Sequence, residues 1–162
     1  MFVAQSPEDL PTRDELLSIS GLEFMTRMAR GDISRPPISG LLNYQVMEVE
    51  DGMVAFQGTP LFGHTNPMGG VHGGWYGTLL DSCMACAVMT KVPQGSVYTT
   101  LEYKVNITRA VPVGMEIIAR GVVGHSGRST AVSTGEIRGR ADGKLYASGS
   151  TTCLIMKIQD PS

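Results

Sequence analysis

The sequence predicts an α+β domain in which a curled antiparallel sheet wraps around one central helix. Segments 44–58 and 97–157 are divided by turn signals into pieces of strand length, and segment 73–89 between them repeats apolar residues at helical spacing. Two strands, one solitary helix and four more strands suit a sheet that buries that helix. We expect two parts, a helical N-terminal extension at 1–40 and the main domain at 41–162.

Short helices are expected in the N-terminal extension. Two capping-box patterns, Thr12-x-x-Glu15 and Ser20-x-x-Glu23, each precede apolar residues. The second helix should end at Gly31, because glycine readily takes the left-handed conformation found at helix ends. The run Arg35-Pro36-Pro37 then predicts an extended connector.

The main domain is expected to contain six strands and one long helix. The strands are placed at 44–50, 53–58, 97–108, 115–124, 129–138 and 145–157, and the helix at 73–89. The pair Asp51-Gly52 is a strong hairpin signal between the first two strands. In strand 97–108 the odd-numbered residues are mostly apolar and the even-numbered ones polar, which predicts one buried face.

Composition excludes several classes of function. The chain has 162 residues, 42% of them hydrophobic, and a net charge of −2, which argues against nucleic-acid partners. It contains no apolar run long enough to span a membrane and no recognisable leader, so we expect a cytoplasmic protein without a membrane partner. Three cysteines in a chain of this size predict reduced thiols.

Cys83 and Cys86 have the spacing of a redox or metal motif. They lie mid-helix on the apolar face without a second ligand pair, which favours buried small side chains. We therefore predict no metal site and no cofactor.

Asp81 is the polar exception in the central helix. It falls between Gly77 and Ala85, one turn away on either side, so its carboxylate rises from a face of small side chains. Glycines within the helix, at 73, 74 and 77, suggest that another backbone, a neighbouring chain or a ligand approaches closely. An acid hydrogen-bonded in a dimer seam is the alternative, but burial of an unpaired carboxylate is costly and favours a functional role.

The run Asn66-Pro-Met-Gly-Gly-Val-His72-Gly73-Gly74, with Asp81 eight residues beyond Gly73, resembles the signature of PaaI-type hotdog-fold acyl-CoA thioesterases. The resemblance extends over about 41–158 and includes the segment 103–109, although Ala110 stands where the family usually has proline. It implies hydrolysis of acyl-CoA to free acid and CoA. It also implies a homo-oligomer, a dimer or a dimer of dimers, in which one site takes its glycine and its acid from different chains.

The chemistry of thioester hydrolysis suggests a role for each residue of this run. Asp81 would be the general base or the nucleophile, and the Gly73 N–H at the helix start would stabilise the oxyanion. Asn66 is either a turn residue or the group that orients water or carboxylate. His72 is expected to be a helix cap rather than a base, and Thr100, or Thr99 if the register differs by one, would add a hydroxyl near the site.

Coenzyme A needs basic residues at the rim of its site. Arg109, Arg128 and Ser129 are candidates, the latter two by resemblance to a family position near the nucleotide, but both arginines are equally explained as solvated turn residues. Two other functions remain open: a hotdog hydratase or dehydratase that uses His72, and a non-catalytic acyl-CoA sensor. Acidic residues and the lack of a basic cluster in the first 40 residues argue against the sensor.

Overall fold

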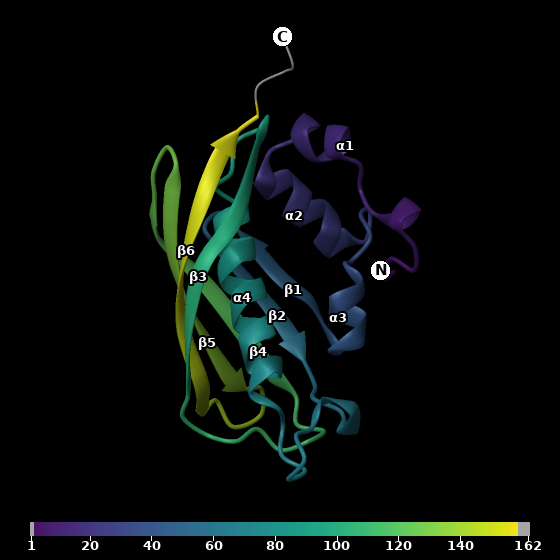
Figure 1. Cartoon of the computed structure of the whole chain (residues 1–162), viewed down its shortest axis with the longest axis vertical. Coiled ribbons are helices and arrows are strands. Elements are labelled where there is room, and N and C mark those ends of the chain that lie inside the picture. Colours follow the sequence, from purple (N-terminus) through teal and green to yellow (C-terminus); the bar gives the residue numbers. More distant parts are fainter. Residues whose placement is uncertain (1, 159–162) are drawn as a thin grey trace.

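The computed structural model describes residues 2–158 and contains one six-stranded antiparallel sheet in the order β1-β2-β4-β5-β6-β3. The strands are β1 Tyr44–Glu50, β2 Met53–Gly58, β3 Ser96–Ile107, β4 Ile117–Ser126, β5 Thr130–Gly139 and β6 Leu145–Lys157. The sheet curls around the central helix α4, Gly73–Met89, which lies in its concave face (Figure 1). The predicted α+β architecture is confirmed.

The bounds of most elements agree with the sequence prediction. The hairpin, the central helix and β6 begin and end where expected, and Gly52 takes a φ of 84° at the hairpin turn. Strand β4 starts two residues later than predicted because the Met115 N–H closes a turn onto the carbonyl of Pro112. The turn therefore includes Met115, and the strand begins after it.

Glycines of the sheet explain how closely the strands approach α4. Gly121, Gly135 and Gly149 are paired neighbours on β4, β5 and β6 and form a row beneath the middle of the helix. A Cβ on Gly121 would collide with the backbone of Cys83, and one on Gly135 would lie 2.7 Å from Cγ of Met84. The row lets the sheet wrap tightly around the helix, which is itself apolar on all sides, as expected for a buried helix.

The N-terminal segment contains the helices η1 Pro7–Asp9, α1 Arg13–Ser18, α2 Gly21–Arg30 and α3 Pro37–Leu41, and the loop before α4 contains η2 Phe62–His64. The helix at Pro37 corrects the expected extended connector. Arg35 forms a β-bridge with Val3 and Pro36 is extended, with φ −65° and ψ 149°, but Pro37 occupies the first helical position. Proline is favoured there because the N–H it lacks would be unpaired in any case.

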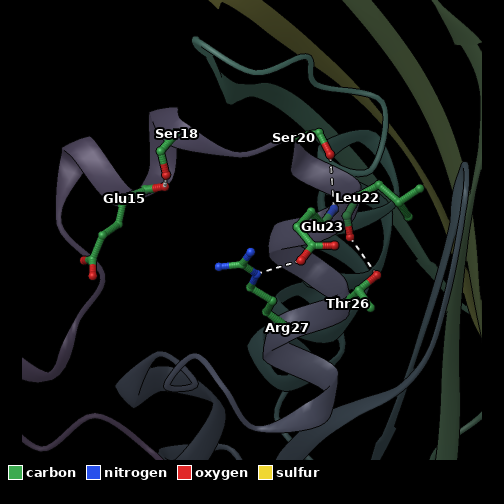
Figure 2. A network of polar contacts seen from close by, with 7 residues as sticks. All are labelled: Glu15, Ser18, Ser20, Leu22, Glu23, Thr26 and Arg27. Carbon is green, nitrogen blue, oxygen red and sulfur yellow. Dashed lines mark hydrogen bonds and ion pairs between the residues drawn. The ribbon is translucent and has the colours of Figure 1, made fainter.

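The two predicted capping boxes differ in the structure. Thr12 and Glu15 bond each other's backbone N–H groups, which makes a complete box. Ser20 accepts from the N–H of Glu23, but the Glu23 carboxylate turns to Arg27, 2.7 Å away (Figure 2). The prediction of a second complete box is wrong, because the Glu23 carboxylate forms an ion pair with Arg27, one turn along the helix, and not a hydrogen bond with the Ser20 N–H.

Helix α2 is part of the same core as the sheet. Its residues Phe24, Met25 and Met28 are buried in one cluster with α4, β1 and β2. The N-terminal helices lie beside β1, across the molecule from β5 and β6 (Figure 1). Gly21 is fixed against the end of α4 by a hydrogen bond from its N–H to the carbonyl of Val92. The division of the chain at residue 40 stays a prediction.

Strand β3 corrects the predicted alternation. Its register shifts between Thr100 and Glu102, so the even-numbered residues before this bulge and the odd-numbered residues after it turn towards α4. Leu101, Tyr103 and Ile107 are 57%, 48% and 47% exposed, because β3 is the last strand of the sheet and no strand within residues 2–158 covers its outer edge. The expected buried face is therefore wrong for the single chain.

Within residues 2–158, no helix combines the length and the apolar character needed to cross a bilayer.

Candidate active site

Asp81 lies on the face of α4 that is turned towards β3. The Thr100 hydroxyl donates a hydrogen bond of 3.1 Å to Oδ1 of Asp81. Thr100, rather than Thr99, is thus the threonine beside the carboxylate. One turn before Asp81 the helix has Gly77, and the hydroxyl of Tyr103 lies 3.5 Å from the position that a Cβ of Gly77 would take. The small-residue face predicted around Asp81 is therefore a place where β3 approaches the helix.

The environment of Asp81 changes its acidity. Burial raises the pKa of this half-buried carboxyl above its ordinary value of 3.8, and the hydrogen bond from Thr100 opposes the shift. A raised pKa makes the ionised carboxylate a stronger base than an exposed aspartate. This property suits a group that must accept a proton or attack a carbonyl near neutral pH.

Replacement of Asp81 by asparagine should stabilise the protein increasingly as the pH rises. Because the folded-state pKa is raised, folding favours protonated Asp81. Protonated Asp81 therefore stabilises the fold fully below the unfolded-state pKa of about 3.9, and this stabilisation is lost as the pH rises through the folded-state pKa. Urea unfolding of both proteins from pH 4 to 8 measures the difference directly. A wild type that gains stability over Asp81→Asn with rising pH would contradict the raised pKa.

The start of α4 is organised by His72. Nδ1 of His72 accepts a 2.9 Å hydrogen bond from the N–H of Gly74, which makes it the N-cap residue, as the sequence interpretation favoured. The N–H of Gly73, the first of the helix, makes no hydrogen bond within the described part of the chain. This exposed N–H therefore remains available at the positive end of the helix.

Asn66 closes the loop that leads into α4. Its Oδ1 accepts hydrogen bonds from the N–H groups of Met68 and Gly70, at 2.9 and 3.2 Å. This is the turn role, one of the two expected roles. Nδ2 of Asn66 has no hydrogen-bond partner among residues 2–158, so the same side chain still has donors for a ligand.

The predicted residues form two groups that one chain does not bring together. Asp81 and Thr100 make one group, and Asn66, His72 and Gly73 gather at the helix start. Eight residues of helix separate Gly73 from Asp81, a distance of roughly 12 Å along the axis at 1.5 Å per residue. A single carbonyl group must lie within about 3 Å of both its oxyanion donor and its attacking group, so one chain cannot supply both to one thioester.

Three residues near Asp81 were not predicted. Tyr44 hydrogen-bonds Ser82 through its hydroxyl at 2.9 Å, and Tyr98 precedes Thr100 on the same face of β3. Burial raises the pKa of both tyrosines, and the charge of Asp81 contributes to each shift. Two features of the sequence could have indicated these residues: Ser82 directly follows Asp81, and Tyr98 lies two residues before Thr100.

The cysteines are free thiols, with Cys83 and Cys153 buried. Burial raises the pKa of Cys86 to about 12, which keeps it a protonated thiol and disfavours redox or metal chemistry. No group of three or more potential metal ligands occurs in the described residues. The interpretation of Cys83 and Cys86 as packing residues agrees with this environment.

The candidate coenzyme-binding residues lie far apart. The N–H of Arg109 bonds the carbonyl of Tyr146 at the start of β6, and the carbonyl of Ser129 accepts from the N–H of Ile155 near its end. Nine residues of strand separate these two points, or roughly 30 Å at about 3.3 Å per residue. Arg109 lies 5.9 Å from the ring centre of Tyr146, while Arg128 and Ser129 are exposed in the β4–β5 turn.

The chain is similar to known thioesterases. The profile of the thioesterase superfamily matches residues 68–146, which include Asp81, Gly73 and Thr100. Acyl-coenzyme A thioesterase 13 of Mus musculus is 28% identical over 89 residues, 55% of this chain and 63% of the mouse protein. The match thus spans less than two thirds of that relative's length.

Solved structures extend the similarity over more of the fold. A phenylacetic acid degradation-related protein from Ralstonia eutropha JMP134 superposes with a TM-score of 0.74 and 28% identity, covering 81% of this chain and 98% of its own. A point mutant of the phenylacetic acid degradation protein PaaI from Thermus thermophilus superposes with a TM-score of 0.67 and 27% identity. The match covers 73% of this chain and 97% of the PaaI chain. The chain is therefore similar to the thioesterase superfamily over residues 68–146 and has the hotdog fold of the PaaI-type thioesterases.

Proposed function

We propose that this protein hydrolyses acyl-CoA thioesters to the free acid and CoA, with Asp81 as the reactive carboxylate. The observation that carries the proposal is the half-buried Asp81, whose pKa is raised and whose Oδ1 is held by Thr100. It is the one charged residue in the sequence of α4. Similarity to the thioesterase superfamily over residues 68–146 supports the same reaction class.

The proposed reaction needs no cofactor, because water is the second substrate. Ionised Asp81 either takes a proton from water as the water attacks the thioester carbonyl, or attacks that carbon itself and is then released by water. The carbonyl electrons move to oxygen, where the Gly73 N–H stabilises the charge. When the carbonyl reforms, the C–S bond breaks and CoA leaves as a thiolate. In the first route the thiolate takes the proton that Asp81 accepted from water. In the second route water cleaves the acyl–Asp81 anhydride to the free acid and ionised Asp81, and its remaining proton goes to the thiolate.

We further propose that two copies of the chain form each site, Asp81 from one and Gly73 from its partner. The separation of roughly 12 Å between these residues along α4 supports this, since one chain cannot bring both to one carbonyl. The outer edge of β3 supports it too, because exposed Leu101, Tyr103 and Ile107 lie on this edge strand, whose outer side pairs with no strand among residues 2–158. A homodimer, alone or as half of a tetramer, would cover these side chains.

Arg109, Arg128 and Ser129 are proposed as coenzyme-binding residues. Their separation along β6 means that one nucleotide contacts either Arg109 or the Arg128–Ser129 turn of a given chain, not both. In a shared site the other region can come from the partner. The cytoplasmic location stays a prediction from the sequence.

A panel of acyl-CoAs with a thiol reagent that detects released CoA tests the proposed reaction. Phenylacetyl-CoA belongs in the panel because the two structural relatives are phenylacetic acid degradation proteins. The expected result is CoA release that depends on enzyme concentration. Lack of release from every member of the panel would reject the function.

Thr100→Val should move the acid limb of the pH–rate profile to higher pH. The Thr100 hydrogen bond lowers the pKa of Asp81, so its loss raises that pKa further, and the ionised form required for turnover appears at higher pH. On the acid limb, where turnover follows the ionised fraction of Asp81, turnover should fall by about tenfold, while the plateau at high pH should change little. Thr99→Val is the matched control, because Thr99 is exposed on the other side of the strand, and an equal shift in both variants would argue against the contact.

A hydratase is less well supported by the geometry. It would need His72 to act as a base paired with an acid, but Nδ1 of His72 is occupied by the Gly74 N–H. Nine helical residues also separate His72 from Asp81, roughly 13 Å at 1.5 Å per residue.

A further inference from the structure

A cavity of about 260 Å³ lies between the N-terminal helix α2 and the central domain. Helices α2 and α4 form two of its walls, through Phe24, Met25, Met28, Ser82, Cys86 and Met89. Strand β1 adds Tyr44, and β3 adds Tyr98. The cavity therefore exists only because the N-terminal extension packs on the sheet and its helix.

One end of this cavity is lined by chain neighbours of Asp81 and Thr100, although these two residues are not part of the lining. Ser82 directly follows Asp81 on α4, and Tyr98 shares a face of β3 with Thr100, which bonds the carboxylate. Helix α4 and strand β3 thus contribute residues both to the cavity wall and to the Asp81–Thr100 pair. Burial raises the pKa of Cys86 to about 12, and the nearby charge of Asp81 adds to this shift.

The cavity has the size of an acyl group. At about 30 Å³ for each non-hydrogen atom, its volume holds roughly nine such atoms. This excludes the whole CoA molecule but fits an octanoyl or phenylacetyl group. The walls are mostly apolar and contain three methionines, whose flexible side chains adapt to chains or rings.

The polar groups in the wall nearest to Asp81 are already paired. The hydroxyls of Tyr44 and Ser82 form a hydrogen bond of 2.9 Å with each other, so neither needs a polar group of the ligand as a partner. At this end an apolar group meets no unpaired hydroxyl, whereas Arg35, which also lines the cavity, has a buried Nε without a hydrogen-bond partner among residues 2–158.

We propose that this cavity binds the acyl group of the substrate, and that α2 sets a preference for apolar acyl groups of about eight carbons. This inference rests on the proposed thioesterase function and specifies its substrate class. The N-terminal extension is then a specificity segment: its side chains determine how deep an acyl chain reaches while Asp81 and Gly73 act on the thioester.

The test is a chain-length series with variants of Met28, which lines the cavity and is 9% exposed. The series comprises acetyl-, butanoyl-, octanoyl-, dodecanoyl- and phenylacetyl-CoA. The wild type should show its highest kcat/KM for octanoyl- or phenylacetyl-CoA. Met28→Ala should move the optimum to longer chains, and Met28→Trp should lower kcat/KM for octanoyl-CoA by at least tenfold relative to acetyl-CoA.

Met53→Ala is the matched control. Met53 is similarly buried, at 7% exposure, but lies on β2 away from the cavity, so this variant should keep the wild-type chain-length profile. Circular dichroism establishes that each variant is folded. An unchanged profile in both folded Met28 variants, or an equal change in Met53→Ala, would overturn the acyl-site inference while hydrolysis itself stands.

Binding separates this inference from the proposed function. In an Asp81→Asn background, calorimetry with octanoyl-CoA should show affinity weakened at least tenfold by Met28→Trp and unchanged by Met53→Ala. This holds even if the wild type releases no CoA from any thioester, a result that would reject the function alone. Equal octanoyl-CoA affinity in the two variants would reject the acyl site.

Discussion

Asp81→Asn should leave a folded protein whose kcat for acyl-CoA hydrolysis is lower by about 10²-fold or more. Asparagine has nearly the same shape and can still accept the hydrogen bond from Thr100, so the packing of α4 against β3 should persist. It cannot, however, take a proton from water or form an acyl intermediate. Steady-state kinetics with the best substrate of the panel gives the ratio.

Asp51→Asn is the control for this substitution. Asp51 lies exposed in the hairpin turn and pairs with Lys91 at 2.7 Å, so its loss should affect turnover little. Turnover within twofold of wild type in folded Asp81→Asn would remove Asp81 from the mechanism. The pH dependence of unfolding would still report whether its pKa is raised.

Two inactive chains should restore activity when they are mixed. Gly73→Val places a branched side chain at the proposed oxyanion donor, and turnover should fall by about 10²-fold. The first added carbon fits the fold, since a Cβ at Gly73 would lie 3.6 Å from Cδ1 of Ile107, an ordinary contact. In a dimer of one Gly73→Val chain and one Asp81→Asn chain, one shared site carries both defects and the other carries none.

The recovered activity can be calculated. With random pairing about half of the dimers are mixed and each has one intact site, so roughly a quarter of wild-type activity should return. If each chain held a complete site, every site would keep one defect and no activity would appear. Native mass spectrometry verifies that mixed dimers are present.

The reciprocal mixture provides a positive control. Wild type mixed equally with a chain carrying both substitutions should retain about a quarter of the activity if sites are shared, and about half if each site lies within one chain. Recovery of activity in the first mixture, together with about a quarter of the wild-type activity in the second, would support the shared site. No activity in the first mixture and about half of the wild-type activity in the second would reject the shared site, while the proposed hydrolytic activity would stand.

Local patterns predicted the hairpin and α4 well because their signals are local. A turn residue pair and a 3.6-residue period act over a few residues, and both elements have the predicted bounds. The bulge at Leu101 could not be predicted, since it depends on how β3 pairs with β6. The same holds for Glu23, whose choice between Ser20 and Arg27 is settled by side-chain geometry.

The candidate site shows the same division. His72 caps the helix that Gly73 begins and that contains Asp81 eight residues later, so a single stretch of sequence predicts their arrangement. The approach of Tyr44 to Ser82 joins residues 38 positions apart, and no periodicity encodes it. The cavity under α2 depends on packing between separate segments and was likewise not foreseen.

The position of β3 in the sheet has a consequence for the order of folding. Among the described residues, β3 pairs only with β6, and Thr100 lies opposite Cys153, 53 residues later in the sequence. During synthesis, β3 must therefore wait without its partner while β4 and β5 pair locally. Such long-range closure is slow and entropically costly. The contact between Thr100 and Asp81 should consequently be among the last to mature, so a nascent chain would hold its hairpins before it holds a working carboxylate.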